Sequence, residues 1–155
     1  MSPGKISLIG AAICCLAAPA ASSPAAGAGT AESTFCVDQI NRLRSTIGVP
    51  HLVRSAAIEA FSNEAARVDG KAREAHKHFR ATEGGHGRSY AQNEIPWWTL
   101  SRYGTVREVI RAGLERQWAE GPGGSHYENL AGHFTHVACG IAVLNGEVTV
   151  TQDFR

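Results

Sequence analysis

Residues 134–154, FTHVACGIAVLNGEVTVTQDF, decide the fold of this chain. Two runs rich in β-forming residues, 134–144 and 147–154, flank the pair Asn145-Gly146. Asn-Gly between two such runs is the strongest short-range signal for a β-hairpin. Because two strands alone are only marginally stable in water, we expect a third strand, near residues 91–95, to pair with the hairpin.

Three helices are expected upstream of the hairpin, because apolar residues recur there at helical spacing. The first is predicted over residues 34–47 and the second over 55–79, whose apolar face, when extended, reaches His76. The third begins at Thr105, which forms a Thr-x-x-Glu capping box with Glu108, and stops before Gly121. The three apolar faces consist of Val37, Ile40, Leu43 and Ile47; of Ile58, Phe61, Ala65, Val68, Ala72 and Phe79; and of Val106, Val109, Ile110, Leu114 and Trp118.

Composition indicates one ordinary globular domain of the α+β class. The 155 residues, 43% hydrophobic and 19% charged, fit a single domain with its own core. The formal net charge of +1, with charges of both signs mixed along the chain, argues against a nucleic-acid-binding surface. The glycine-rich segment 84–87 predicts a loop between the second helix and the third strand.

The N-terminal segment has the pattern of a secretory signal. Lys5 precedes an uncharged apolar run over residues 6–18, and a stretch of small residues follows. The apolar run is shorter than the roughly 20 residues that a membrane-spanning helix needs. We therefore expect a signal peptide and small-residue leader over 1–28, a linker over 29–33 and a folded domain over 34–155. The mature protein is expected to be secreted or periplasmic, monomeric and without a transmembrane segment.

Two cysteines remain once the leader is removed. The chain has four cysteines, of which Cys14 and Cys15 lie in the leader and Cys36 and Cys139 in the domain. Export places the domain in an oxidising compartment, which favours a Cys36–Cys139 disulfide. Two buried thiols are the alternative, because sequence alone does not show the separation of the two residues.

The candidate site consists of histidines and carboxylates. The chain lacks His-Glu-x-x-His, Gly-x-Ser-x-Gly, P-loop and dinucleotide-binding motifs, so no catalytic residue is assigned. Glu94 lies beside Ile95 and two tryptophans, where an unpaired carboxylate would be costly. Glu120 lies at a helix C-terminus, which the helix dipole disfavours, and His126 is within reach of it. Neutral imidazole and carboxylate are typical metal ligands. Taken singly, each of these residues also has a purely structural explanation.

Several segments resemble the CAP superfamily, the cysteine-rich secretory protein, antigen 5 and pathogenesis-related 1 proteins, in its bacterial form. The likeness covers nearly everything from Cys36 to Phe154, and the order and spacing of the motifs carry it. The motifs are Asn41-x-x-Arg44, Ala75-His76-Lys77-His78-Phe79, Gln92-Asn93-Glu94, Gln117-Trp118 through Gly124-Ser125-His126, and Phe134 to Ala142 with Thr151-Gln152-Asp153-Phe154.

The resemblance implies a three-layer α-β-α sandwich whose central cleft holds a divalent metal, zinc being expected. Its two His and two Glu ligands correspond to His76, Glu94, Glu120 and His126. Three alternatives stay open. His78 competes with His76, and Gln92 stands where the family has the Glu of its Glu-Asn pair, in place of Glu94. Gly132-His133-Phe134-Thr135 is similar to another family motif and makes His133 the alternative to His126, although the distance to Cys139-Gly140 favours His126.

Two functions are compatible with this reading. The first is an exported, non-enzymatic binding module whose cleft holds a metal and a small hydrophobic, lipid or envelope ligand. The second is a zinc-dependent, peptidase-like hydrolase, in which two His and one Glu hold the metal and the other Glu is the general base.

Overall fold

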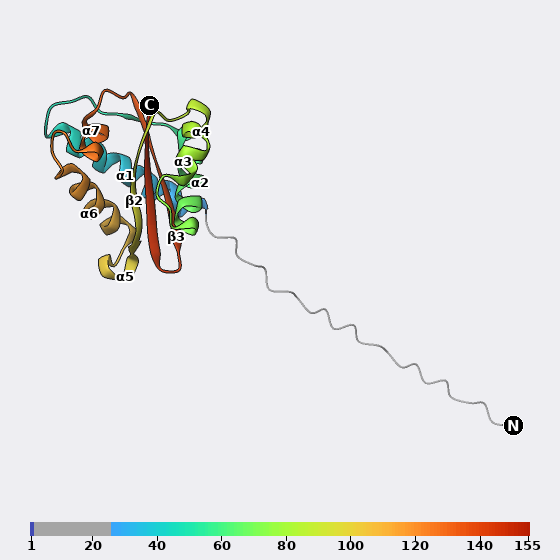
Figure 1. Ribbon diagram of the computed structural model, residues 1–155. Helices are drawn as coiled ribbons and strands as arrows, with labels where there is room; N and C mark the ends of the chain where they lie inside the picture. The colour runs from blue at the N-terminus through green and yellow to red at the C-terminus, as the bar shows by residue number, and fades with distance from the viewer. Residues whose placement is uncertain (2–25) are drawn as a thin grey trace.

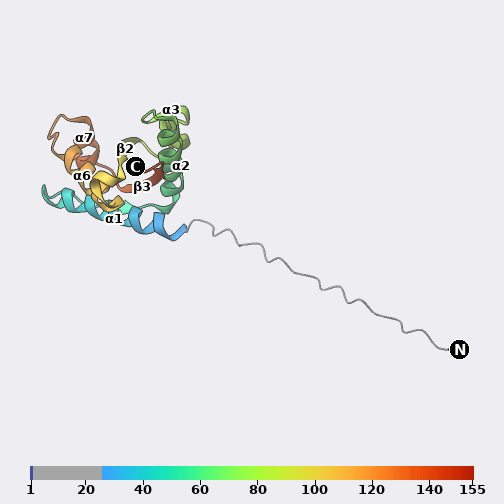
Figure 2. The same cartoon turned by 90° about the horizontal axis from the view of Figure 1, so that it is seen from below.

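The computed structural model describes residue 1 and residues 26–155. Most of the predicted leader, residues 2–25, therefore lies outside the described part of the chain. The described residues form a four-stranded sheet with helices on both faces, in agreement with the expected three-layer α-β-α sandwich (Figures 1 and 2). No helix in this part of the chain is long and apolar enough to cross a membrane.

The sheet has the strand order β1-β3-β4-β2 and contains the predicted hairpin. Strands β3 (His136–Leu144) and β4 (Glu147–Phe154) are antiparallel, and the turn residues Asn145 and Gly146 have φ of 52° and 77°. Positive φ at both positions is the requirement that Asn-Gly meets. Strand β2 (Ala91–Thr99) pairs with β4 and confirms the expected third strand. The sequence analysis did not foresee β1 (Val53–Arg54), which runs parallel to β3.

Helices cover both faces of the sheet. One face of the sheet carries α2 (Ala56–Ala72), with α3 (Lys77–Ala81) and α4 (Glu83–Gly87) beyond it; the other carries α1 (Ala26–Ser45), α6 (Val106–Trp118) and α7 (Ser125–Ala131) (Figure 2). A short helix, α5 (Leu100–Tyr103), follows β2. The main apolar core lies on the α1 and α6 side; its buried members include Val37, Ile40, Leu43, Val109, Ile110, Leu114, Val148 and Val150.

Helix α2 lies unusually close to the sheet. A Cβ atom on Gly140 of β3 would lie 1.9 Å from the backbone oxygen of Ser62, so only glycine fits there. The Thr151 hydroxyl donates to the same oxygen over 2.9 Å. This close contact brings buried polar side chains of β4 under α2 and sets up the polar layer described below.

The first helix is longer than expected. It begins at Ala26, so residues 29–33, expected to be a linker, are helical. Ser33 is fully buried and Glu32 forms an ion pair with Arg107 of α6 at 2.9 Å. These tertiary contacts, together with good helix formers such as alanine, extend the helix beyond the apolar periodicity.

The second helix is shorter than expected. It ends at Ala72, Arg73 and His76 adopt left-handed φ of 53° and 58°, and α3 then begins at Lys77. A side-chain oxygen of Asp69 accepts from the backbone N–H of His78 over 2.8 Å and holds this break in place. The prediction of one helix over 55–79 was therefore wrong, and His76 lies in a turn rather than on the inner face of a helix.

The expected loop at 84–87 is a single left-handed turn. Gly84, Gly85 and His86 all have φ near +60°, at 64°, 66° and 59°. The predicted start of α6 is confirmed, because the Thr105 hydroxyl accepts from the backbone N–H of Glu108 over 3.2 Å.

The Asn41-x-x-Arg44 motif has a structural role. The Asn41 side chain bonds both backbone groups of Leu52, at 2.8 Å and 3.0 Å. Arg44, only 2% exposed, donates to the backbone oxygens of Pro50, Leu130 and Gly132 at 2.8, 2.6 and 3.0 Å. One buried guanidinium thus connects α1 to the following loop and to the C-terminal end of α7.

The predicted disulfide is present. Cys36 of α1 and Cys139 of β3 are bonded, with their Cα atoms 6.2 Å apart and a sequence separation of 103 positions. Both residues are fully buried, so the bond lies inside the main core.

Candidate functional site

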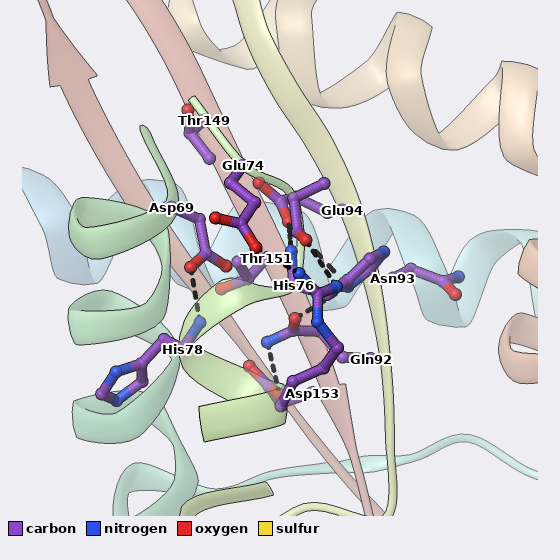
Figure 3. Close-up of polar contacts among 12 residues, drawn as sticks. Asp69, Glu74, His76, His78, Gln92, Asn93, Glu94, Thr149, Thr151 and Asp153 are labelled. Carbon is purple, nitrogen blue, oxygen red and sulfur yellow. Dashed lines mark hydrogen bonds and ion pairs between the residues drawn. The ribbon is translucent and has the colours of Figure 1, made fainter. Parts of the chain in front are cut away.

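The candidate residues gather around β2, which forms an edge of the sheet. Successive side chains of a strand point to opposite faces. Gln92 and Glu94 accordingly face the α2 and α3 side, whereas the Asn93 side chain projects to the opposite side (Figure 3). One strand therefore contacts both of the histidines that the sequence analysis favoured.

His76 is held by Gln92 and Glu94. Its backbone N–H donates to Glu94 Oε2 over 2.7 Å, and its ring Nδ1 lies 2.9 Å from Gln92 Oε1 (Figure 3). Gln92 Nε2 donates to the carboxylate of Asp153 over 3.0 Å, which orients the amide with its oxygen toward His76. His76 Nδ1 is therefore the donor, and its Nε2 keeps a lone pair.

The competing histidine, His78, has a different environment. Its ring packs on Phe61 with centroids 5.3 Å apart and points away from Gln92 and Glu94 (Figure 3). The structure thus places His76, not His78, beside the β2 residues.

Glu120 and His126 form the second pair. Glu120 lies just past the end of α6, and its carboxylate accepts from His126 Nδ1 at 2.6 Å and from the His126 backbone N–H at 3.1 Å. A Cβ atom on Gly124 would lie 2.4 Å from Cβ of Glu120, so glycine permits the chain to fold back. The bond to His126 lowers the pKa of the Glu120 carboxyl.

Asn93 connects the two sides of the site. Its fully buried side chain donates to the backbone oxygen of His126 over 3.0 Å and accepts from Asn129 over 2.8 Å. The start of α7 is thereby attached to the sheet edge. His133, the alternative to His126, is exposed and lies two residues after the end of α7.

Three buried acids lie together on the α2 side of the sheet. Burial raises the pKa of Glu94 to about 7 and that of Asp153 to about 6, and it also raises the pKa of Asp69. One carboxylate oxygen of each acid has no hydrogen-bond partner in the described part of the chain. The sequence analysis missed Asp69 and Asp153; the available signal was an acid at an inward position of each element.

These raised pKa values predict a pH-dependent stability. Between the usual carboxyl range and pH 7 the folded protein binds more protons than the unfolded chain, so its free energy of unfolding falls as the pH rises. In metal-free buffer we expect the free energy of unfolding, measured in urea, to be on the order of 2–3 kcal/mol lower at pH 7.5 than at pH 5.

Glu94→Gln is the informative variant for this prediction, because an amide resembles the protonated acid. It should remove most of the pH dependence, whereas Glu115→Gln, which changes an exposed carboxylate on α6, should leave it unchanged. An equally steep pH dependence in Glu94→Gln would contradict the assignment.

A pocket of about 250 Å³ opens between β2 and α6. Glu94, Glu120 and His126 contribute to its lining, with Trp98, Arg116 and Gln117 beside them. The last three residues were not assigned to a site from the sequence. Arg116 and Gln117 sit on α6 close to the predicted Glu120, and this proximity was the available signal.

The described side chains do not form a preassembled cage for a metal ion. In residues 26–155 no three His, Cys, Asp or Glu side chains are arranged so that they could hold a metal ion. The four expected ligands thus form two His–carboxyl pairs rather than a four-ligand cage. Each histidine has its Nδ1 engaged by a side-chain oxygen, which leaves Nε2 available. A metal-binding histidine commonly has this arrangement, so each of the two rings, taken by itself, has the hydrogen bonding of a metal ligand.

The chain is thus an α-β-α sandwich domain with a polar site at its edge strand. The family model described as CAP, cysteine-rich secretory protein family, matches residues 37–154. The chain belongs to this family.

Structural comparison agrees with the family assignment. The crystal structure of a cysteine-rich secretory protein from Staphylococcus aureus is similar, with a TM-score of 0.53 and 9% sequence identity. The similarity covers 84% of this chain but 40% of that protein, and at this identity it shows the fold alone. A search of curated proteins gives no match.

Proposed function

We propose that this protein is an exported CAP domain that binds a divalent metal through Nε2 of His76 and His126 and a small ligand in the adjoining pocket. Glu120, Gln92 and Glu94 orient the two histidines. Export is supported by the signal-like N-terminus and by a disulfide that an oxidising compartment favours.

The observation that carries the metal proposal is that Nδ1 of each histidine is hydrogen-bonded to a side-chain oxygen, of Gln92 for His76 and of Glu120 for His126. The two rings are about one-third exposed, with side-chain exposures of 32% and 34%, so both Nε2 atoms lie on accessible side chains. A neutral imidazole with its Nδ1–H bonded to an oxygen is the form that binds zinc.

Calorimetric titration with Zn²⁺ tests this proposal. The unmodified protein should bind one ion, His126→Ala should lose the binding, and Glu120→Gln should bind about 10–100-fold more weakly, because the partner of a ligating histidine tunes its affinity. His133→Ala is the matched control and should bind as the unmodified protein does. No zinc binding, or binding lost in His133→Ala but retained in His126→Ala, would reject these ligands.

A zinc-dependent hydrolase is the second candidate, and the state of Glu94 favours it. A divalent ion bound here would supply Lewis-acid activation of a water molecule. Glu94 Oε1 has no partner in the described residues, and its carboxyl has a pKa of about 7, which suits a general base that accepts a proton at neutral pH. Turnover of peptide or ester substrates with Zn²⁺, abolished in Glu94→Gln, would support this candidate; no turnover in the unmodified protein would reject it.

A further inference from the structure

Two arginines beside the pocket have no carboxylate partner. Most exposed arginines in residues 31–155 form ion pairs, among them Arg67, Arg73, Arg80 and Arg107. Arg102 and Arg116 are exposed and form none within that part of the chain, although Arg102 lies over the ring of Tyr103. An uncompensated guanidinium can bind a carboxylate through two parallel hydrogen bonds.

The two arginines line two adjoining pockets that share Trp98 and Arg116, together called the groove. Arg116 lines the pocket of about 250 Å³ next to Glu94 and also a second pocket of about 260 Å³ that includes Arg102. Trp98 lines both pockets as well, so an aromatic ring lies at their junction. A ligand that spans the groove would contact an aromatic surface and two cations.

The backbone of β2 is distorted around Trp97 and Trp98. The pairing of β2 with β4 shifts register between Ile95 and Trp98, which marks a β-bulge, and Trp97 has a φ of 36°. A bulky residue with positive φ is strained, and such strain concentrates at functional sites. Bulges are common next to binding sites, where they redirect side chains.

A buried glutamine at the inner end of the groove has an unpartnered hydrogen-bond acceptor. Gln117, only 5% exposed, donates from Nε2 to the backbone oxygen of Glu94 over 3.0 Å, while its Oε1 has no partner in the described residues. A buried acceptor without a donor is costly, so a ligand with hydroxyl groups would be favoured here.

We propose that this groove binds an acidic oligosaccharide; this rests on the proposed ligand pocket. Sugar rings lie against Trp98, hydroxyl groups donate to Gln117, and sugar carboxylates pair with Arg102 and Arg116. An extended peptide would bind by pairing with the backbone of β2 as an additional strand, and this fits less well. The backbone oxygen of Glu94 already accepts a hydrogen bond from Gln117, and Pro96 has no backbone N–H to donate.

Tryptophan fluorescence titration with tetragalacturonate, with neutral cellotetraose as the matched ligand, tests the proposal. The purified protein should bind tetragalacturonate at least about tenfold more tightly, and the preference should shrink as salt is added. Arg116→Ala and Arg102→Ala should each weaken binding about tenfold, as expected for one lost charge-assisted contact. Arg111→Ala, on the same helix but paired with Glu108, should have no effect.

Zinc titration of the same samples separates this inference from the proposed function. Arg116→Ala is expected to bind zinc normally while losing the acidic sugar. Equal binding of the two sugars, no binding of either, or tighter binding of an acidic peptide would overturn the inference. If zinc binding persisted in those cases, the metal site would still stand.

Discussion

Replacement of both Cys36 and Cys139 with alanine is expected to lower the free energy of unfolding by about 4–5 kcal/mol. The bond closes a loop of 103 residues, and a loop of that size restricts the unfolded chain by about this amount in the chain-entropy model. A domain has only about 5–15 kcal/mol of stability in total, so the loss is a large fraction of it.

Urea unfolding of the double variant beside the unmodified protein measures this effect. The unmodified protein unfolded in the presence of a thiol reductant should show a similar loss, which separates the crosslink from the packing of the two side chains. A loss below 1 kcal/mol in both samples would mean that the bond adds little to stability.

Arg44→Met is expected to destabilise the protein by about 3–5 kcal/mol. Methionine fills a similar space but leaves the backbone oxygens of Pro50, Leu130 and Gly132 without their donor. Hydrogen bonds from a charged group contribute about 1.5–3 kcal/mol each, and removal of the buried charge itself offsets part of the loss.

Arg42→Met is the matched control for this prediction. Arg42 lies two positions earlier on α1, its side chain is 52% exposed, and its ion pair with Glu115 spans 3.7 Å. Exposed pairs of this kind contribute about 0–1 kcal/mol. Comparable losses in Arg42→Met and Arg44→Met, measured by thermal or urea unfolding, would contradict the structural role assigned to Arg44.

The features that the sequence by itself determined are those set by neighbouring residues. Asn145-Gly146 requires positive φ at two adjacent positions, which specifies the hairpin turn wherever the segment lies. Thr105 caps α6 through a bond to a residue three positions away. The pairing of Cys36 with Cys139 followed from elimination, because no other cysteines remain outside the predicted leader.

The tertiary structure decided the arrangement of the site. The periodicity of residues 55–79 favoured one helix, but Asp69 and Glu94 accept the backbone N–H groups of His78 and His76 and stabilise the break. Similarly, only the fold shows that Gln92 holds the ring of His76 and that Arg116 lines the same pocket as Trp98. Hydrogen bonds, burial and pKa depend on which distant residues meet, and spacing along the chain does not specify those meetings.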